Sequence, residues 1–217
     1  DDFHHMGAFL QSYLYAFPVF GVNKEMPTTK SWYEHEWDPF EKAGDPSNGY
    51  EYNLGIGSLK NVTEKIYPQN FFWEQIVEHP NYDEFWQKRS ILPHLKEIDH
   101  AVMTVGGWFD AEDLYGPLNI YKNLEANNPG IKNTIVMGPW SHGDWAREKG
   151  MQSVNHIYFG DSISTYYQKN IEEPFFRHHL KQEGNLNLPE AFMFDTGIKE
   201  WKKFDIWPPK NNLPVSL

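Results

Sequence analysis

The 217-residue sequence predicts an α/β fold built on a parallel β-sheet. Two short apolar runs, residues 101–105 and 134–137, are each followed by glycine and have the length of buried strands. Between them, residues 114–124 have the apolar spacing of an amphipathic helix, which Asn-Asn-Pro-Gly at 127–130 would end. Strand, helix and strand in this order predict a βαβ unit, in which the two strands are parallel.

The preceding residues, from about 10 to 97, are predicted to be mostly helical. A helical spacing of apolar residues in the segment 3–20 ends at Pro18, and its members are Phe9, Leu10, Tyr13, Leu14 and Phe17. Residues 21–60 contain several Pro and Gly, which favour loops and short helices. The segments Asn-Val-Thr-Glu at 61–64 and Asn-Tyr-Asp-Glu-Phe-Trp at 81–86 predict two further helix starts.

The residues after the βαβ unit predict one more helix and then a change of structure. The helix covers 161–181, with an apolar stripe formed by Ile163, Tyr166, Tyr167, Ile171 and Phe175. From Pro189 on, Ala-Phe-Met-Phe at 191–194 and Asp-Thr-Gly at 195–197 predict a strand and a turn that begin a new β element.

The composition excludes several classes of function. A formal net charge of -11 repels phosphate backbones, so nucleic acid is not an expected partner. No stretch approaches 18 consecutive apolar residues, so no membrane span is expected. The absence of cysteine excludes thiol nucleophiles and Cys-based zinc sites, and the adjacent histidine pairs at 4–5 and 178–179 lack metal-ligand spacing, so we expect neither metal nor cofactor. Without an initiator Met, and ending in a Pro-rich stretch, the chain is expected to be a fragment of a longer protein.

Polar side chains follow both strands of the predicted βαβ unit. Asp110 lies in Gly-Gly-Trp-Phe-Asp-Ala-Glu-Asp at 106–113, and His142 lies in Gly-Pro-Trp-Ser-His-Gly at 138–143. Because the carboxyl ends of parallel strands share one edge, the two side chains can meet there. The carboxylate would then fix the tautomer of the imidazole and stabilise its charged form. Spacing alone leaves a second interpretation open, in which Asp110 caps a helix and His142 is an ordinary loop residue.

These two loops resemble those of a group of α/β-hydrolases. The group contains α-amino-acid ester hydrolases, X-Pro dipeptidyl-peptidases, cocaine esterase-like enzymes and glutaryl-7-aminocephalosporanic acid acylase-like proteins. The similarity extends in order to segments 1–9, 82–86 and 192–201, and so covers nearly the whole chain. The triad order of this fold is Ser, Asp, His, so the resemblance implies Asp110 as the acid and His142 as the base.

The nucleophile of this group lies in a Gly-x-Ser-Tyr-x-Gly motif, which the sequence lacks. Ser141 is too close to His142 in sequence to take its place. We therefore expect the chain alone to be inactive, because an Asp–His pair without a nucleophile has nothing to activate.

The resemblance also implies a partial α/β-hydrolase fold with an inserted helical cap and the start of a C-terminal jelly-roll β domain. Residues 1–2 would end the N-terminal half of the hydrolase core, and residues 3–97 would form the cap. Residues 98–188 would form the C-terminal part of the core, and residues 189–217 the start of the jelly roll.

Three carboxylates match positions that bind the substrate's α-ammonium group in the ester hydrolases: Asp2, Glu112 and Asp113. Three acids facing one pocket favour a cation. The alternative is that Glu112 and Asp113 neutralise a helix N-terminus and that Asp2 is solvated.

The implied parent protein is a serine hydrolase that acts through an acyl-enzyme. It would cleave α-amino acid esters, β-lactam acyl side chains or N-terminal dipeptides, so its partner is a small-molecule or peptide substrate. Members of the group commonly self-associate, so a homo-oligomer is possible by this resemblance. Bacterial members are often exported, which favours a periplasmic or secreted location, although a chain without cysteine also suits the cytoplasm. The alternative is a non-catalytic binding or scaffold module of the same fold, against which the presence of both Asp110 and His142 argues.

Overall fold

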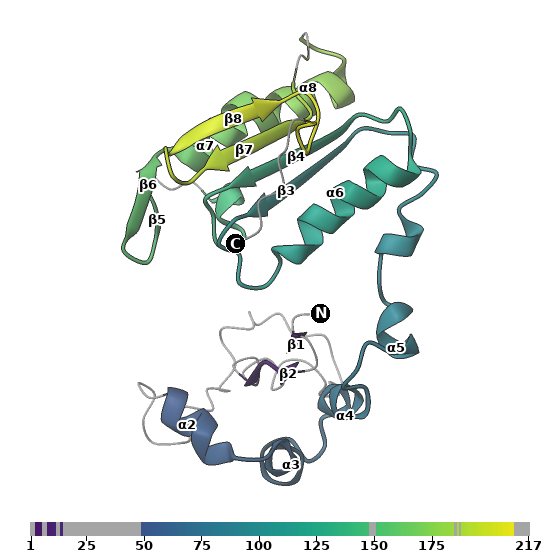
Figure 1. Cartoon of the computed structure of the whole chain (residues 1–217), viewed down its shortest axis with the longest axis vertical. Helices are drawn as coiled ribbons and strands as arrows, with labels where there is room; N and C mark the ends of the chain where they lie inside the picture. Colours follow the sequence, from purple (N-terminus) through teal and green to yellow (C-terminus); the bar gives the residue numbers. More distant parts are fainter. Residues whose placement is uncertain are drawn as a thin grey trace. The chain divides into compact units, whose positions relative to one another are not determined.

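The computed structural model describes residues 3–5, 8–11, 14, 49–147, 151–184, 186 and 188–210. The chain divides into two compact units, residues 1–90 and residues 91–217 (Figure 1). Each unit has a hydrophobic core of its own. The division falls between Ser90 and Ile91, slightly before the boundary predicted at residues 97–98.

The second unit contains a four-stranded sheet in the order β3-β4-β7-β8. Strands β3 (Val102–Gly107) and β4 (Asn133–Gly138) are parallel neighbours, with Val102 opposite Asn133. Strand β7 (Ala191–Asp195) is parallel to β4 on its other side, and β8 (Glu200–Phe204) is antiparallel to β7. Because α6 (Tyr115–Asn127) connects β3 to β4, the predicted βαβ unit is confirmed.

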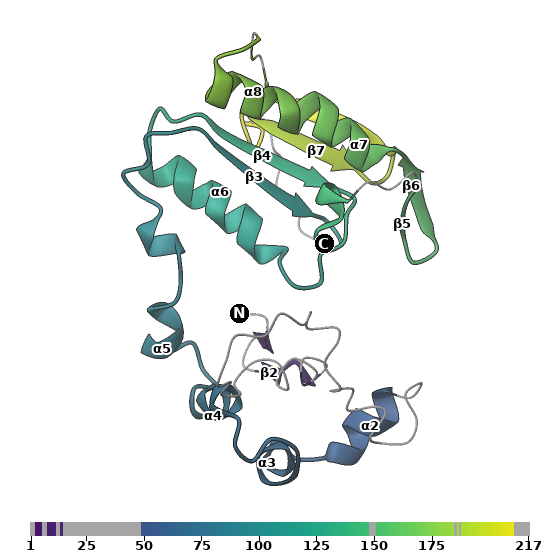
Figure 2. The ribbon, with the colours of Figure 1, turned by 180° about the vertical axis from the view of Figure 1, so that it is seen from behind.

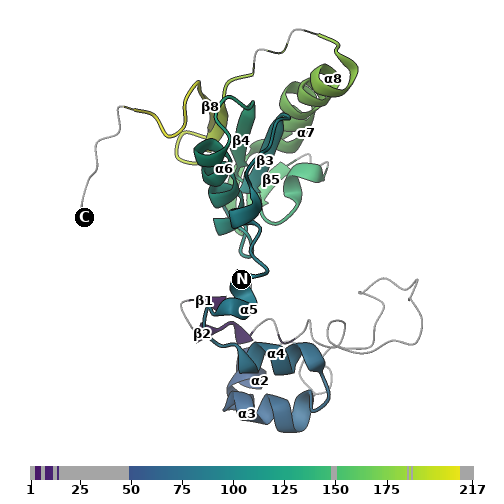
Figure 3. The same ribbon diagram turned by 90° about the vertical axis from the view of Figure 1, so that its right-hand side faces the viewer.

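Helices cover both faces of this sheet (Figures 2 and 3). Helix α6 lies on one face, and the predicted helix over 161–181 lies on the other, as α7 (Ile163–Tyr167), the π-helical η6 (Gln168–Glu172) and α8 (Glu173–Lys181). Ile135 and Met137 of β4 share a core cluster with Tyr121 of α6, whereas Val136 packs with Ile163 of α7. All 6 residues of β4 are buried, as expected for a strand covered on both faces.

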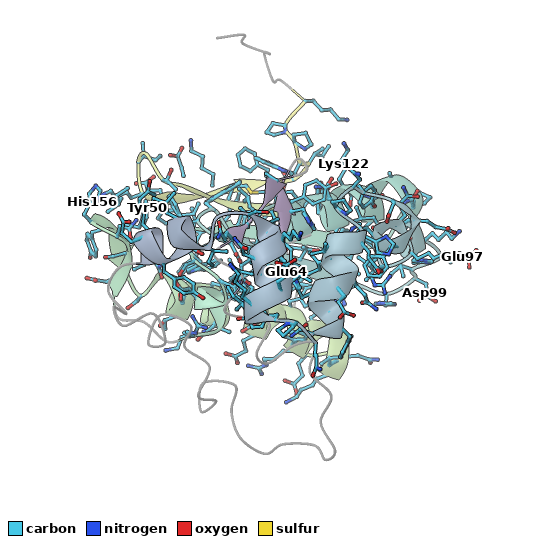
Figure 4. The ribbon with its side chains drawn as sticks, turned by 90° about the horizontal axis from the view of Figure 1, so that it is seen from below. Tyr50, Glu64, Glu97, Asp99, Lys122 and His156 are labelled. Carbon is cyan, nitrogen blue, oxygen red and sulfur yellow. The ribbon has the colours of Figure 1, made fainter. Side chains whose placement is uncertain are left out.

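Asn128 joins the end of α6 to the segment that precedes β3. Its Nδ2 donates to the carbonyl oxygens of Leu95 (3.0 Å) and Leu124 (3.1 Å), and its Oδ1 accepts from Ile98 N at 2.8 Å. The segment before β3 also contains the 3-10 turn η4 (Leu92–His94). Glu97 and Asp99, on either side of Ile98, are exposed, as is Lys122 on the outer face of α6 (Figure 4).

The prediction for the residues after Pro189 is corrected by the pairing of β7. The sequence predicts a new β domain over 189–217, whereas Ala191 lies opposite Ile135 in the same sheet as the βαβ unit. Both faces of Ala-Phe-Met-Phe at 191–194 are apolar, and all 4 residues are buried, as a central strand between two helical layers requires. The described residues as far as 204 therefore extend the α/β sheet.

A hairpin that the sequence analysis does not predict follows the second loop. Strands β5 (Met151–Val154) and β6 (Ile157–Asp161) are antiparallel, with a register shift at Gln152 and Ser153 that disturbs the alternation of side chains. The turn is Asn155-His156, and Asn155 has a φ of 52°, which asparagine tolerates. His156 is exposed at the turn (Figure 4), while Phe159 of β6 is buried against Phe109 and Phe194.

In the first unit, short helices surround an aromatic core. They are α2 (Gly49–Ile56), α3 (Leu59–Asn61), the π-helical η3 (Val62–Ile66), α4 (Phe71–Glu78) and α5 (Glu84–Gln87). Trp73 is fully buried in this core with Val62 and Ile76, and its Nε1 donates to Thr63 Oγ1 at 2.9 Å. Asp83 caps α5, near the predicted helix start, by accepting from Phe85 N at 3.0 Å.

Two sequence predictions for this unit are corrected. The helical spacing over residues 3–20 predicts a helix, but β1 (His4–His5) pairs antiparallel with β2 (Ala8–Phe9). Phe9 instead packs edge-on against Trp73, so its burial needs no helix; Tyr13 and Phe17 lie outside the described residues. The expected cap Asn61 ends α3 and takes the N-cap position of η3, but its side chain makes no cap hydrogen bond and donates to Ile56 O at 2.8 Å instead. No helix within the described ranges is long and apolar enough to cross a membrane.

Candidate active site

Asp110 and His142 meet at the carboxyl edge of β3 and β4. Gly107 lies opposite Gly138 as the last pair of the two strands. Beyond this pair, Trp108 N donates to Gly138 O at 2.9 Å and Phe109 N donates to Trp140 O at 3.1 Å. These bonds continue the pairing of the two segments beyond the ends of β3 and β4. They therefore bring the two following loops close together.

The close approach of the two loops depends on the glycine at position 107. A Cβ atom at this position would lie 2.2 Å from Trp140 O. A backbone oxygen that accepts a hydrogen bond from Phe109 N cannot move away without breaking the pairing of the loops. The absence of a side chain at Gly107 is therefore a condition for the site.

The Asp110 carboxylate has two sets of partners. Its Oδ1 accepts from Glu112 N at 2.9 Å and from Asp113 N at 3.0 Å, and so closes the turn 110–113. Its Oδ2 lies 3.0 Å from His142 Nδ1. The side chain is 1% exposed. The sequence offers two interpretations of Asp110, as the partner of His142 and as a helix cap, and the carboxylate makes bonds of both kinds. It caps the turn 110–113, however, and not α6, whose N-cap position is Leu114.

His142 is held at one nitrogen and accessible at the other. Its side chain is 57% exposed, and Nδ1–H donates to Asp110, which leaves Nε2 as the basic nitrogen of the neutral ring. Partial burial lowers the pKa of His142, but the hydrogen bond and the charge of Asp110, with the charges of Glu112 and Asp113, outweigh it. The pKa of His142 is therefore raised above the usual 6.5.

The other candidate carboxylates lie in different surroundings. Glu112 Oε2 is 3.8 Å from His142 Nε2, at the accessible side of the imidazole. Asp113 lies against the first turn of α6, because a Cβ at Gly116 would overlap its carboxylate. This position fits the alternative in which Asp113 neutralises a helix N-terminus. Asp2 lies outside the described residues.

Two charged residues of the His142 loop are absent from the sequence prediction. Asp144 begins the 3-10 turn η5 (Asp144–Ala146), and its side chain, 1% exposed, forms an ion pair with Arg147 at 3.2 Å. Ser141 Oγ donates to Asp144 Oδ2, and within the described residues no serine hydroxyl bonds to His142. A signal was available, since Ser141-x-x-Asp144 has the spacing of a capping box.

The segment that contains both loops is similar to a known protein family and to a known esterase. Residues 4–144, which include Asp110 and His142, match the family described as X-Pro dipeptidyl-peptidase (S15 family). Cocaine esterase from Rhodococcus sp. (strain MB1 Bresler) is 28% identical over 140 residues, which are 62% of this chain and 23% of the esterase.

Two solved structures share the fold. An aminopeptidase from the marine sediment archaeon Thaumarchaeota archaeon matches with a TM-score of 0.76 and 30% identity, over 97% of this chain and 33% of its own. A selenomethionine-labelled α-amino acid ester hydrolase matches with a TM-score of 0.73 and 21% identity, over 96% of this chain and 32% of its own. The chain thus spans about a third or less of the length of these relatives.

Proposed function

The chain belongs to the X-Pro dipeptidyl-peptidase (S15) family, and from this we propose that it supplies the acid and the base of a serine hydrolase triad. Asp110 is the acid and His142 is the base. The proposal rests on one observation, the 3.0 Å bond between His142 Nδ1 and the buried Asp110 carboxylate at the carboxyl ends of the parallel strands β3 and β4. The family and its relatives support hydrolysis of esters or peptides.

The reaction is a two-step acyl transfer. A serine from the rest of the protein attacks the carbonyl carbon while its proton passes to His142 Nε2, and the imidazolium then protonates the leaving group. Water attacks the acyl-enzyme, giving its proton to the same nitrogen, which returns a proton to the serine as the acid product leaves. Asp110 stays ionised and stabilises the imidazolium. The given sequence lacks the Gly-x-Ser-Tyr-x-Gly motif of the nucleophile, so the serine and the oxyanion hole are proposed to come from another part of the protein.

The substrate proposed here carries a free α-ammonium group. Glu112 supports this because its carboxylate is 3.8 Å from the nitrogen that would receive the serine proton, so it lies beside the reacting atoms. Asp2 and Asp113 are the other two acids proposed for this set, Asp113 through its negative charge, since its carboxylate lies against the first turn of α6. Residues 3–97, largely the helical first unit, are proposed as the cap of this fold.

The test of the proposed reaction uses the protein that contains both this chain and a Gly-x-Ser-Tyr-x-Gly segment. It should hydrolyse a phenylglycine ester or an Xaa-Pro-anilide, and His142→Ala should reduce kcat by a factor of about 1,000 or more. The 217-residue chain alone should show no turnover. Turnover by the purified chain that disappears in His142→Ala would contradict the missing nucleophile, and unchanged kcat in the larger protein would contradict the triad.

The same assay separates the ammonium site from the triad. The substrates are a phenylglycine ester and its N-acetyl derivative, and Glu112→Gln should reduce the preference for the free amine by about tenfold. Glu173→Gln, on α8, serves as the matched control and should leave the preference unchanged. Equal rates for the two esters in the unaltered protein would show that the acids do not select the substrate.

A further inference from the structure

We propose that Asp144, together with Arg147, is a positioning residue that holds the 141–147 loop in the conformation in which the imidazole of His142 meets Asp110. The proposal deepens the proposed function, because it concerns the base of that site. The geometry it invokes is nevertheless present in this chain and can be measured without catalysis.

The side chain of Asp144 connects the two ends of the loop. On one side Oδ2 accepts from Ser141 N at 3.3 Å and from Ser141 Oγ. On the other side Oδ1 accepts from Arg147 Nη1 at 3.2 Å, and the same Nη1 donates to His142 O at 3.1 Å. The backbone of His142 therefore lies within a closed ring of hydrogen bonds, and Asp144 is the acceptor common to both sides.

The backbone of Asp144 fixes this ring to the helical layer of the sheet. Ser164 Oγ, in α7, donates to Asp144 O at 3.0 Å and accepts from Trp140 Nε1 at 3.0 Å. Trp140 and Ser164 are almost fully buried. Gln168, in η6, donates to Trp145 O at 2.8 Å, which adds a second attachment. The loop is thus attached at Asp144 and Trp145, and just before its start at Trp140, to elements that do not carry the catalytic pair.

His142 needs this support because its own side chain provides little. The imidazole is 57% exposed, and the next residue, Gly143, has a φ of 73°, which reverses the chain direction beside it. A carboxylate that is 1% exposed is also costly unless it is fully paired. Both oxygens of the Asp144 carboxylate accept hydrogen bonds. The amide of an asparagine at this position could accept from Ser141 N or from Arg147, but its N–H₂ group would then face the remaining donor.

The test is the titration of His142 in the 217-residue chain by NMR, with its signal identified by its loss in His142→Gln. The variants are Asp144→Asn and Arg147→Gln, and the control is Glu183→Gln, which removes a comparable pair with Arg177 on α8. Within the described part of the chain, the other charged groups that face His142 are Asp110, Glu112 and Asp113, and all of them stay unchanged in these variants.

The two variants distinguish positioning from simple charge. If Asp144 and Arg147 acted only as charges, removal of the anion would lower the pKa of His142 and removal of the cation would raise it. If they position the loop, both variants loosen the bond to Asp110, so both lower the pKa by about 0.5 or more.

We expect both variants to lower the pKa of His142 while the control leaves it unchanged. Shifts of opposite sign, or an unchanged pKa in folded variants, would overturn the proposal. Should Asp144→Asn fail to fold, Arg147→Gln alone decides, because Arg147 is 60% exposed and its removal leaves no cavity. Since the readout requires no turnover, failure of this proposal and failure of the proposed reaction are distinguishable.

Discussion

Among the single residues of the site, Asp110 combines two kinds of bond in one carboxylate. One oxygen accepts two backbone N–H groups of the turn 110–113, and the other binds the imidazole of His142. An amide at this position retains an acceptor for the turn but loses the negative charge. Asp110→Asn therefore separates the structural contribution of the residue from its effect on His142.

We expect Asp110→Asn to lower the pKa of His142 toward 6.5 or below, because an amide does not stabilise the imidazolium. At about pH 9, where His142 is neutral, the free energy of unfolding should change little in Asp110→Asn, whereas Asp110→Ala, which also loses the turn, should cost about 1 kcal/mol more. NMR titration and urea unfolding measure the two effects. An unchanged His142 titration in Asp110→Asn would show that the pair is not coupled in solution.

The raised pKa also makes a prediction about pH and stability. A histidine whose pKa is higher in the folded chain contributes stability that is fully present below 6.5, its unfolded value, and is lost as the pH rises through the folded value. The difference in the free energy of unfolding between the unaltered chain and Asp110→Asn should therefore shrink between about pH 6 and about pH 9. A difference that grows over this range would reverse the assigned sign.

The sequence predicts Asp110 and His142 because each follows an apolar strand, and strand ends in a parallel sheet share an edge. Asp144 could not be predicted with the same logic. Its proposed role depends on its burial and on a hydrogen bond to its backbone oxygen from Ser164, which is 20 residues away in the chain. Glu112 and Asp113 are neighbours in sequence, yet only the structure shows that one faces His142 and the other faces α6.

At the scale of elements, the site depends on how closely β3 and β4 continue side by side after they end. Gly107 allows Phe109 N to reach Trp140 O, and Asp110 and His142 follow directly. The backbones of the two strands thus determine how closely Asp110 and His142 approach each other.

Gly107→Ala should destabilise the second unit by about 1–3 kcal/mol, because the added methyl group meets a backbone oxygen and not a flexible side chain. The variant should also lower the pKa of His142 by separating it from Asp110. Urea unfolding and NMR titration test these effects. The matched control is Gly55→Ala in α2, where nothing lies within 4 Å of the added atom, and which should be neutral or slightly stabilising. Equal stability of Gly107→Ala and the unaltered chain would contradict the account.

The long elements of the second unit follow from periodicity, and the short ones do not. The apolar pattern predicts β3, β4, α6 and the helix over 161–181, because each buries one stripe or both faces. The sequence does not predict the hairpins β1–β2 and β5–β6, since β1 and β2 have two residues each and the register shift between β5 and β6 disturbs the alternation of side chains. For β7, the strand was predicted but its partner was not, because pairing with β4 is a contact between segments distant in sequence.

At the scale of the whole chain, the two units differ in what they contribute to the site. The partners of Asp110 and His142 described above all lie within residues 91–217, as does the core that supports their loops. The boundary falls before residue 97 because Asn128 binds Leu95 and Ile98, which attaches that segment to α6. No local pattern reveals a bond between residues 30 positions apart.

We expect residues 91–217, expressed alone, to fold cooperatively and to keep the raised pKa of His142. The reason is that the sheet, both helical layers and every described partner of the pair lie within this segment. Near-UV circular dichroism and urea unfolding test the fold, and NMR titration tests the pair. A fragment that binds a hydrophobic dye, lacks a near-UV signal and unfolds without cooperativity would show that the second unit depends on the first.

The two sets of bonds at Asp110 also have a consequence for descendants of this protein that lose the proposed reaction. Selection for folding alone would keep an acceptor at position 110, because the N–H groups of Glu112 and Asp113 require one. It would not keep a histidine at 142, whose imidazole is more than half exposed and, among the described residues, bonds only to Asp110 and faces Glu112. Position 142 would therefore drift first, so an intact histidine there, more than the aspartate, marks a lineage in which the chemistry is still under selection.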